Sequence, residues 1–176
     1  ERVTIHTNKK TIPGGENINL CTSFSTGKYT AIFHSDDVYH KDILSKQVHF
    51  MEEHNDVGVV FTNGCMIDEN DKFIGALNTP SEIPNICDYN QIISFILKYS
   101  NFMICPSAIV RSKIYNVRNI WNYSKFKTSC DLGVWLRIAE SYKIGFIHEN
   151  LINYRISKLQ DSENNRISIK KADFFL

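Results

Sequence analysis

Residues 29–37 read Tyr-Thr-Ala-Ile-Phe-His-Ser-Asp-Asp, an apolar run that ends in two adjacent carboxylates, Asp36 and Asp37. Tyr, Thr, Ile and Phe favour a buried strand, and Gly27-Lys28 before them indicates a bend. The pattern predicts a strand over 29–33 that carries both acids to its carboxyl end, where ligands bind in α/β sheets. A divalent cation shared with a phosphorylated substrate would offset their mutual repulsion. Alternatively, the pair only opens a turn or caps the next helix.

The flanking segments indicate an α/β fold. Residues 2–7 alternate as in a strand, and apolar positions within 16–25 follow a helical stripe that Gly27 would end as a C′ residue. Together with 29–33, these segments predict a βαβ unit. In the next part of the chain, the patterns predict a helix over 40–54, a strand over 57–61, a hairpin with its turn at 68–71 and a loop over 75–87. A helix is predicted from Asp88 to Tyr99, opened by a capping box with Gln91, and is followed by extended segments at 102–104 and 107–110 that form one side of a pocket. The last predicted elements are a helix from Ser129 to Tyr142 and strands over 143–148 and 151–155.

Composition narrows the class of protein. The 176 residues are 43% hydrophobic with a net charge of +1, which suits one soluble domain, and the scattered basic residues give no support for nucleic-acid binding. The longest apolar run, near 92–97, is too short to span a bilayer. Five widely spaced cysteines indicate reduced thiols in a cytoplasmic protein. Because the chain opens directly on a strand pattern without Met, we expect it to be part of a longer protein.

A second acidic motif lies at the start of the helix expected from Ser129. Leu132, Trp135 and Ile138 share one face of that helix, so Asp131 falls in its first turn. There the free N–H groups and the helix dipole favour an ionised carboxylate, which is poised to accept a proton. The alternative is that Asp131 only stabilises the helix start.

Two blocks of this sequence resemble family 2 glycosyltransferases of the GT-A fold. In the first, Asn19 lies ten residues before Tyr29 of a Gly-x-Tyr, and Ser35-Asp36-Asp37 stands as a variant of the Asp-x-Asp motif. In the second, Asp131-x-x-x-Trp-Leu-Arg is similar to the family's Glu-Asp segment, and Tyr154-Arg155 is similar to its closing Tyr-Arg segment. The resemblance implies an α/β, GT-A-like mixed sheet flanked by helices, with 1–176 as a single domain that lacks the family's N-terminal nucleotide-binding βαβ unit.

The resemblance also implies an activity and its residues. Asp37 would bind Mn²⁺ or Mg²⁺, Ser35, Asp36 and Arg155 would contact the donor, and Asp131 would be the general base. The implied reaction moves a sugar, with inversion, from a nucleotide-diphosphate donor to a hydroxyl of a carbohydrate or lipid-linked acceptor. The resemblance also implies that this reaction belongs to polysaccharide biosynthesis at the cytoplasmic face of a membrane. Peripheral association of the protein with that membrane stays open.

Two departures from the family pattern keep other functions open. His34 stands where the longer acidic motif has Asp, and Cys130 stands where Glu is usual. A catalytically silent domain that binds sugars or partner proteins therefore remains an alternative. Nucleotidyltransferase chemistry also uses metal-binding carboxylates, but its Gly/Arg/Lys-rich phosphate loop is absent from this sequence.

Overall fold

The fold is that of a computed structural model, which describes residues 3–115, 120–122 and 129–157. Its helices are α1 (Gly14–Ser23), α2 (Ile43–Glu53), α3 (Tyr89–Tyr99), the 3₁₀ turn η1 (Cys105–Ser107), α4 (Ser112–Tyr115) and α6 (Cys130–Ala139). Its strands are β1 (Tyr29–Ala31), β2 (Val38–Tyr39), β3 (Val57–Ile67), β4 (Phe73–Leu77), β5 (Ile86–Cys87), β6 (Ile109–Arg111) and β7 (Lys143–Arg155).

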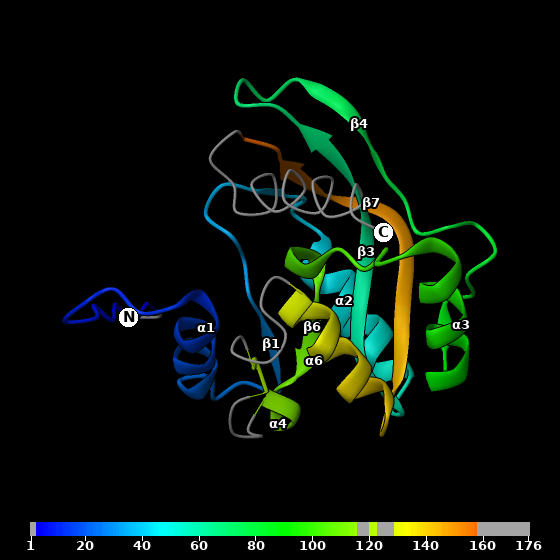
Figure 1. Cartoon of the computed structure of the whole chain (residues 1–176), viewed down its shortest axis with the longest axis horizontal. Coiled ribbons are helices and arrows are strands. Elements are labelled where there is room, and N and C mark those ends of the chain that lie inside the picture. Colours follow the sequence, from blue (N-terminus) through cyan, green and yellow to red (C-terminus); the bar gives the residue numbers. More distant parts are fainter. Residues whose placement is uncertain (1–2, 116–119, 123–128, 158–176) are drawn as a thin grey trace, which may run out of the picture.

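The described strands form one mixed sheet built on the long parallel pair of β3 and β7 (Figure 1). The strand order is β1-β6-β3-β7-β2, with β4 added to β3 and β5 to β7, and every other pairing is antiparallel. Gly64 permits the close approach of the central pair, because a Cβ there would lie 2.7 Å from the carbonyl oxygen of Ile152. The carboxyl ends of β3 and β7 consequently lie side by side.

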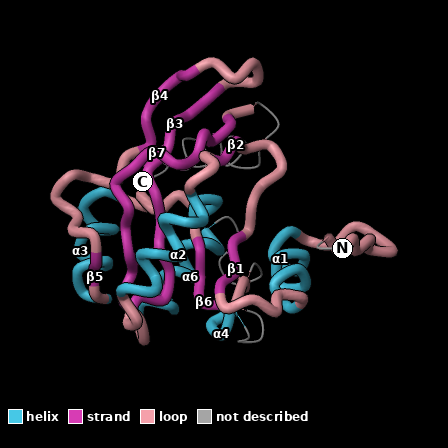
Figure 2. The backbone as a smooth tube through the Cα atoms, turned by 180° about the vertical axis from the view of Figure 1, so that it is seen from behind, coloured by secondary structure: helices cyan, strands magenta, loops and turns pink. Residues whose placement is uncertain are grey.

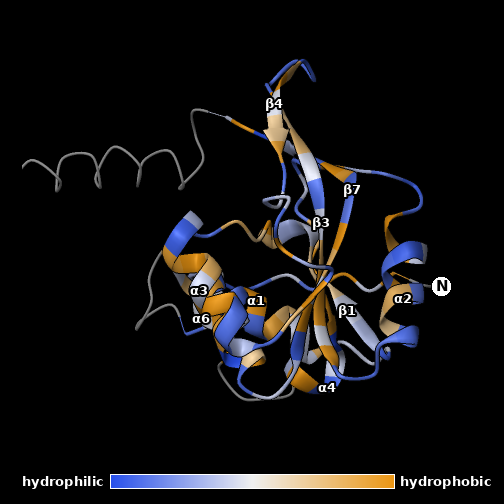
Figure 3. Cartoon of the chain, turned by 90° about the vertical axis from the view of Figure 1, so that its right-hand side faces the viewer, coloured by the Kyte–Doolittle hydropathy of each residue, from blue (hydrophilic) through white to orange (hydrophobic). Residues whose placement is uncertain are grey.

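Helices cover both faces of this sheet (Figure 3). On one face α2 packs over a small core that contains Met51, Val57 and Val60. On the other, α3 and α6 enclose a larger core in which Phe61, Trp135 and Phe146 are fully buried. The β3–β4 hairpin projects beyond the helices (Figure 3), and β3 ends at its turn, where Ile67 pairs with Arg155 at the end of β7.

Several sequence predictions are confirmed. Asp88 and Gln91 form both halves of the capping box that opens α3, and the chain turns at 68–72 between β3 and β4. The side chain of Asp88 accepts from the backbone N–H of Gln91 at 2.9 Å, as the motif requires. All five cysteines lie in the described ranges and are free thiols. No helix in those ranges is long and apolar enough to cross a membrane.

The βαβ unit predicted from residues 2–7, 16–25 and 29–33 is wrong. Residues 3–8 adopt no regular structure, and the side chains of Val3 and Ile5 are 74% and 87% exposed. This N-terminal segment extends from the molecule beside α1 (Figure 2). An alternating pattern makes a strand only where another strand pairs with it, and β1 instead pairs antiparallel with β6. Helix α1 ends at Ser23 with Phe24 as its C-cap, so Gly27 is not its C′ residue.

Other boundaries also move. β1 ends at Ala31, so Asp36 and Asp37 lie in the turn before β2 rather than at a strand end. The expected helix 40–54 is shorter, whereas the strands expected at 57–61 and 143–148 continue to Ile67 and Arg155. Those extensions follow from mutual pairing of β3 and β7, a long-range contact that local patterns do not report.

Candidate active site

An acidic turn between β1 and β2 brings three ligand-type side chains together. One oxygen or nitrogen atom each of His34, Asp36 and Asp37 lies within 4.8 Å of the others. The pairing of β2 with β7 fixes one end of the turn. At the other end, the backbone N–H of His34 donates to the Tyr39 hydroxyl at 2.8 Å. The sheet therefore holds this turn in a defined conformation.

Asp37 is the buried member of the acidic turn. Its side chain is 1% exposed, and its Oδ1 accepts from the backbone N–H of Arg155 at 2.9 Å. Its Oδ2 has no hydrogen-bond partner in the described part of the chain; Nδ1 of His34 lies 4.0 Å away. Burial is the main cause that raises the pKa of Asp37 above its ordinary value, and the charge of Asp36 adds to it.

The donor set fits a hard divalent cation. A buried carboxylate oxygen without a partner is costly, and a cation would satisfy it. Two carboxylates and one imidazole suit Mg²⁺ or Mn²⁺ better than the soft metals that thiolates select. His34 lies beside these carboxylates rather than in the core. A histidine in place of the family's Asp therefore still provides a ligand-type atom in the turn.

Arg155 ties this turn to the β3–β4 hairpin. Its Nε donates to the Asp36 carbonyl at 2.7 Å, its Nη1 to the Asp68 carbonyl at 2.7 Å, and its Nη2 to Asp71 at 2.6 Å. The guanidinium therefore already braces the chain around the acids. Ser35, the other predicted donor contact, is exposed in the same turn.

Asp131 lies in the first turn of α6, as predicted. Its Oδ1 accepts from the backbone N–H of Leu132 at 2.8 Å, and its Oδ2 from Nδ2 of Asn101 at 3.3 Å. The helix start was expected to favour the ionised carboxylate. These hydrogen bonds do act in that direction, but burial outweighs them and raises the pKa of Asp131. The predicted cap is also wrong, since the Ser129 side chain makes no capping hydrogen bond.

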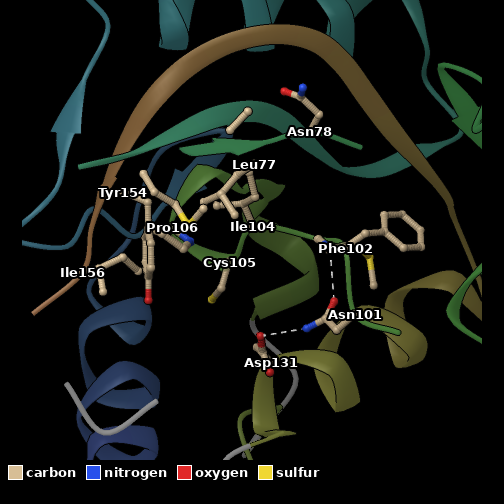
Figure 4. Close-up of a pocket in the computed structure, with 13 residues that line it drawn as sticks. Leu77, Asn78, Asn101, Phe102, Ile104, Cys105, Pro106, Asp131, Tyr154 and Ile156 are labelled. Carbon is tan, nitrogen blue, oxygen red and sulfur yellow. Dashed lines mark hydrogen bonds between the residues drawn. The ribbon is translucent and has the colours of Figure 1, made fainter. Parts of the chain in front are cut away.

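Asp131 opens into a pocket of about 590 Å³ (Figure 4). Residues 102–106 form one wall, which confirms the predicted pocket for 102–104, whereas residues 107–110, expected on the same side, do not line it. Tyr154 and Ile156, on either side of Arg155 in sequence, line it from the end of β7. The pocket thus lies between the α6 start and the strand end that holds the acidic turn.

Cys105 links the two acidic motifs. It lines the pocket beside Asp131 and also a small cavity beside His34. Burial raises the pKa of its thiol, and the negative charges of Asp131 and Asp37 raise it further. The charges of Asp37 and Asp131, which are far apart in the sequence, therefore both reach Cys105.

Sequence reasoning missed Asn101 and Cys105 as pocket residues. No spacing connects position 101 to position 131, because their contact depends on how α3 packs beside α6. The only local signal is a polar residue between the end of a predicted helix and an extended apolar run. Cys130, in contrast, is buried in the core and does not line the pocket.

Comparison with known proteins gives the family. Residues 2–118 match the family described as Glycosyl transferase family 2. The chain belongs to glycosyl transferase family 2.

Among curated relatives, the chain is 29% identical over 172 residues to uncharacterized glycosyltransferase MJ1057 of Methanocaldococcus jannaschii, covering 97% of this chain and 56% of that one. It is 29% identical over 143 residues to an uncharacterized glycosyltransferase of Rickettsia felis, covering 79% of this chain and 21% of that one. The chain thus spans about half the length of the first relative and about a fifth of the second.

Solved structures confirm the predicted fold class. The crystal structure of S. aureus TarS 1–349 matches with a TM-score of 0.56 at 17% identity, over 80% of this chain and 40% of that one. The same protein in complex with UDP-GlcNAc matches with a TM-score of 0.53 at 16% identity, over 81% and 38%. The fold is GT-A-like, a mixed sheet flanked by helices.

Proposed function

We propose that this chain carries the metal-binding turn and the general base of an inverting glycosyltransferase that uses a nucleotide-diphosphate sugar. The observation that carries the proposal is the buried Asp37 Oδ2, which lacks a partner within the described residues and faces His34 in a cluster of ligand-type side chains. Family membership and a pocket that contains a second, half-buried acid support it.

In this proposal the acidic turn binds the nucleotide-sugar donor. Asp37 would hold Mn²⁺ or Mg²⁺, with Asp36 and His34 as neighbouring ligands, and the exposed Ser35 would contact the donor nucleotide. A bound divalent cation would stabilise the negative charge that a diphosphate leaving group develops. Arg155 keeps the turn in place through its contacts with Asp36 and the hairpin.

Asp131 acts at the acceptor end. Its carboxylate accepts the proton of an acceptor hydroxyl as that oxygen attacks the anomeric carbon. The bond from that carbon to the diphosphate oxygen breaks, and the electron pair leaves with the diphosphate. Attack from the face opposite the leaving group inverts the anomeric configuration. A pKa raised by burial makes Asp131 a stronger base than an ordinary carboxylate once it is ionised.

The substrate class follows from the family and from the chemistry of the site. UDP-GlcNAc is the ligand named for the TarS complex, so UDP-sugars are the first donors to test. We propose a carbohydrate or lipid-linked acceptor in polysaccharide biosynthesis, at the cytoplasmic face of a membrane. Residues 1–176 would serve as a single domain of the enzyme.

A silent binding domain is the second candidate. Cys130, where the family usually has Glu, is buried in the core, and this position offers no carboxylate to the pocket. A silent domain has no need to hold a metal, so metal dependence separates the two candidates.

Calorimetric titration of UDP, GDP and dTDP into the full-length protein, with and without Mn²⁺, tests the proposal. We expect one nucleotide to bind only with Mn²⁺, and binding to be lost in Asp37→Ala. The control is Asp42→Ala, which removes a nearby exposed acid outside the cluster. Metal-independent binding, or equal binding by the two variants, would contradict the proposed site.

A further inference from the structure

Helix α3 ends in a backbone conformation that only glycine adopts without strain. Ser100, its C-cap, has φ 61° and ψ −160°. Its N–H still donates to the Ile96 carbonyl at 2.8 Å, so the strain belongs to the turn that follows the helix. Strained non-glycine residues concentrate at functional sites, where the surrounding structure holds them. The residue that follows Ser100 in this turn is therefore a candidate for a functional role.

That residue is Asn101, whose amide orientation is set by a backbone contact. Its side-chain oxygen accepts from the N–H of Met103 at 3.1 Å, and Met103 is anchored in the core with 4% exposure. Because a backbone N–H only donates, the amide oxygen must face Met103. The amide nitrogen consequently points to Oδ2 of Asp131, 3.3 Å away (Figure 4).

We propose that Asn101 is a positioning residue for Asp131, holding the carboxylate toward the pocket and favouring its ionised form. The proposal rests on the proposed function of Asp131 as general base. In the described residues, Asn101 is the only side chain that donates a hydrogen bond to Asp131, whose other oxygen accepts from the Leu132 N–H. Loss of Asn101 would leave Oδ2 of Asp131 without a hydrogen-bond donor from the described residues.

The other groups around Asp131 do not replace this contact. Cys105 on η1 and Cys130 on α6 face it with thiols whose pKa burial raises, so both remain neutral. Tyr154 lines the same pocket from β7. Among the described residues that line this pocket there is no Lys or Arg. Among the described side chains, the neutral amide of Asn101 is thus the donor that favours the charged form of the base, together with the backbone N–H of Leu132.

The test is an NMR titration of the Asp131 carboxyl carbon in ¹³C-labelled protein, without donor, acceptor or metal; Asp131→Asn assigns the resonance. Asn101→Ala removes both amide contacts. Asn101→Ser keeps a hydroxyl that can accept from Met103, as in related turns, but is too short to reach Asp131. Ser100→Gly relaxes the backbone and leaves the amide in place, which makes it the matched control.

We expect the titration midpoint of Asp131 to rise by about 0.7 units in both Asn101 variants, the equivalent of one ordinary hydrogen bond. It should stay within about 0.2 units in Ser100→Gly, since a turn that keeps its amide contacts keeps the donor. An unchanged midpoint in Asn101→Ala would overturn the proposal. A wild-type midpoint in Asn101→Ser with a shifted one in Asn101→Ala would also overturn it, because the turn and not the donor would then set the midpoint.

This titration is independent of the proposed activity. If the midpoint moves and the full-length protein turns over no nucleotide sugar, the proposed function fails while the Asn101–Asp131 contact stands. If the protein is active and the midpoint does not move, Asn101 has no positioning role. With an active donor, the acidic limb of kcat/KM should move upward by the same amount in Asn101→Ser, while the KM for the donor stays unchanged.

Discussion

The backbone N–H of Arg155 donates to Oδ1 of Asp37 at 2.9 Å, across 118 positions of sequence. This hydrogen bond joins the end of β7 to the turn that carries the proposed metal ligands. Because it uses the backbone of Arg155, it orients one oxygen of Asp37 and leaves the other, Oδ2, to face His34. The carboxylate is thus buried and oriented before any ligand binds.

Asp37→Asn should stabilise the metal-free protein. The amide oxygen can keep the contact with the Arg155 N–H, and the substitution removes a buried charge, so we expect the free energy of unfolding to rise by about 1 kcal/mol. Mn²⁺ should stabilise the wild type and not the variant. Thermal unfolding with and without Mn²⁺ measures both effects. Equal stabilisation of the two proteins by Mn²⁺ would show that Asp37 is not a ligand.

Arg155→Lys should weaken metal binding without abolishing it. Lysine cannot reach the carbonyls of Asp36 and Asp68 together with Asp71, as the planar guanidinium does. The backbone contact with Asp37 survives, so we expect Mn²⁺ affinity to fall by about tenfold, as for other residues that orient metal ligands. Arg137→Lys, at an exposed position of α6, is the control. Unchanged affinity in Arg155→Lys would rule out this bracing role.

The stability of the protein should depend on pH through Asp131. Burial raises the folded-state pKa above the ordinary value of 3.8, so folding favours the protonated carboxyl. The destabilising contribution is absent below pH 3.8, grows as pH rises toward the folded-state pKa, and is complete above it. Asp131→Asn should therefore gain stability relative to the wild type across that window. Denaturant unfolding of both proteins at a series of pH values measures it, and parallel curves would contradict the burial effect.

Ser100→Gly should make the protein more stable. Glycine adopts the observed backbone angles without strain, and we expect the free energy of unfolding to rise by about 1 kcal/mol after allowing for glycine's greater freedom in the unfolded chain. Ser45→Gly, within α2, should do the opposite because its backbone is helical. Chemical denaturation compares the two variants, and a loss of stability in Ser100→Gly would mean that the serine is not strained.

Local sequence signals predicted the elements whose structure is locally determined. The capping box of Asp88 and Gln91 and the β3–β4 turn both rest on contacts within a few residues, and both are confirmed. The strand predicted from the alternation of residues 2–7 is wrong, since strand formation depends on a partner elsewhere in the chain. For the same reason, the length of β7 became evident only from its pairing with β3.

The candidate site was predictable in part. The motifs predict Asp36, Asp37 and Asp131, and the charges of Asp37 and Asp131 both act on Cys105 in the structure. The bracing contacts of Arg155 and the donor contact of Asn101 were not predictable, because each joins segments that meet only in the folded chain. The net direction of the Asp131 pKa also required its burial, which motif position alone does not report.

The most direct measurement is nucleoside-diphosphate release from UDP-, GDP- and dTDP-sugars by the full-length protein with Mn²⁺, using water or added oligosaccharides as acceptors. The account predicts turnover of one donor class, and a loss of at least about 100-fold in Asp131→Asn, the usual contribution of a general base. It also predicts that Asp131→Asn keeps Mn²⁺-dependent nucleotide binding. Release that is as fast in Asp131→Asn as in the wild type, or no release from any donor, would contradict the account.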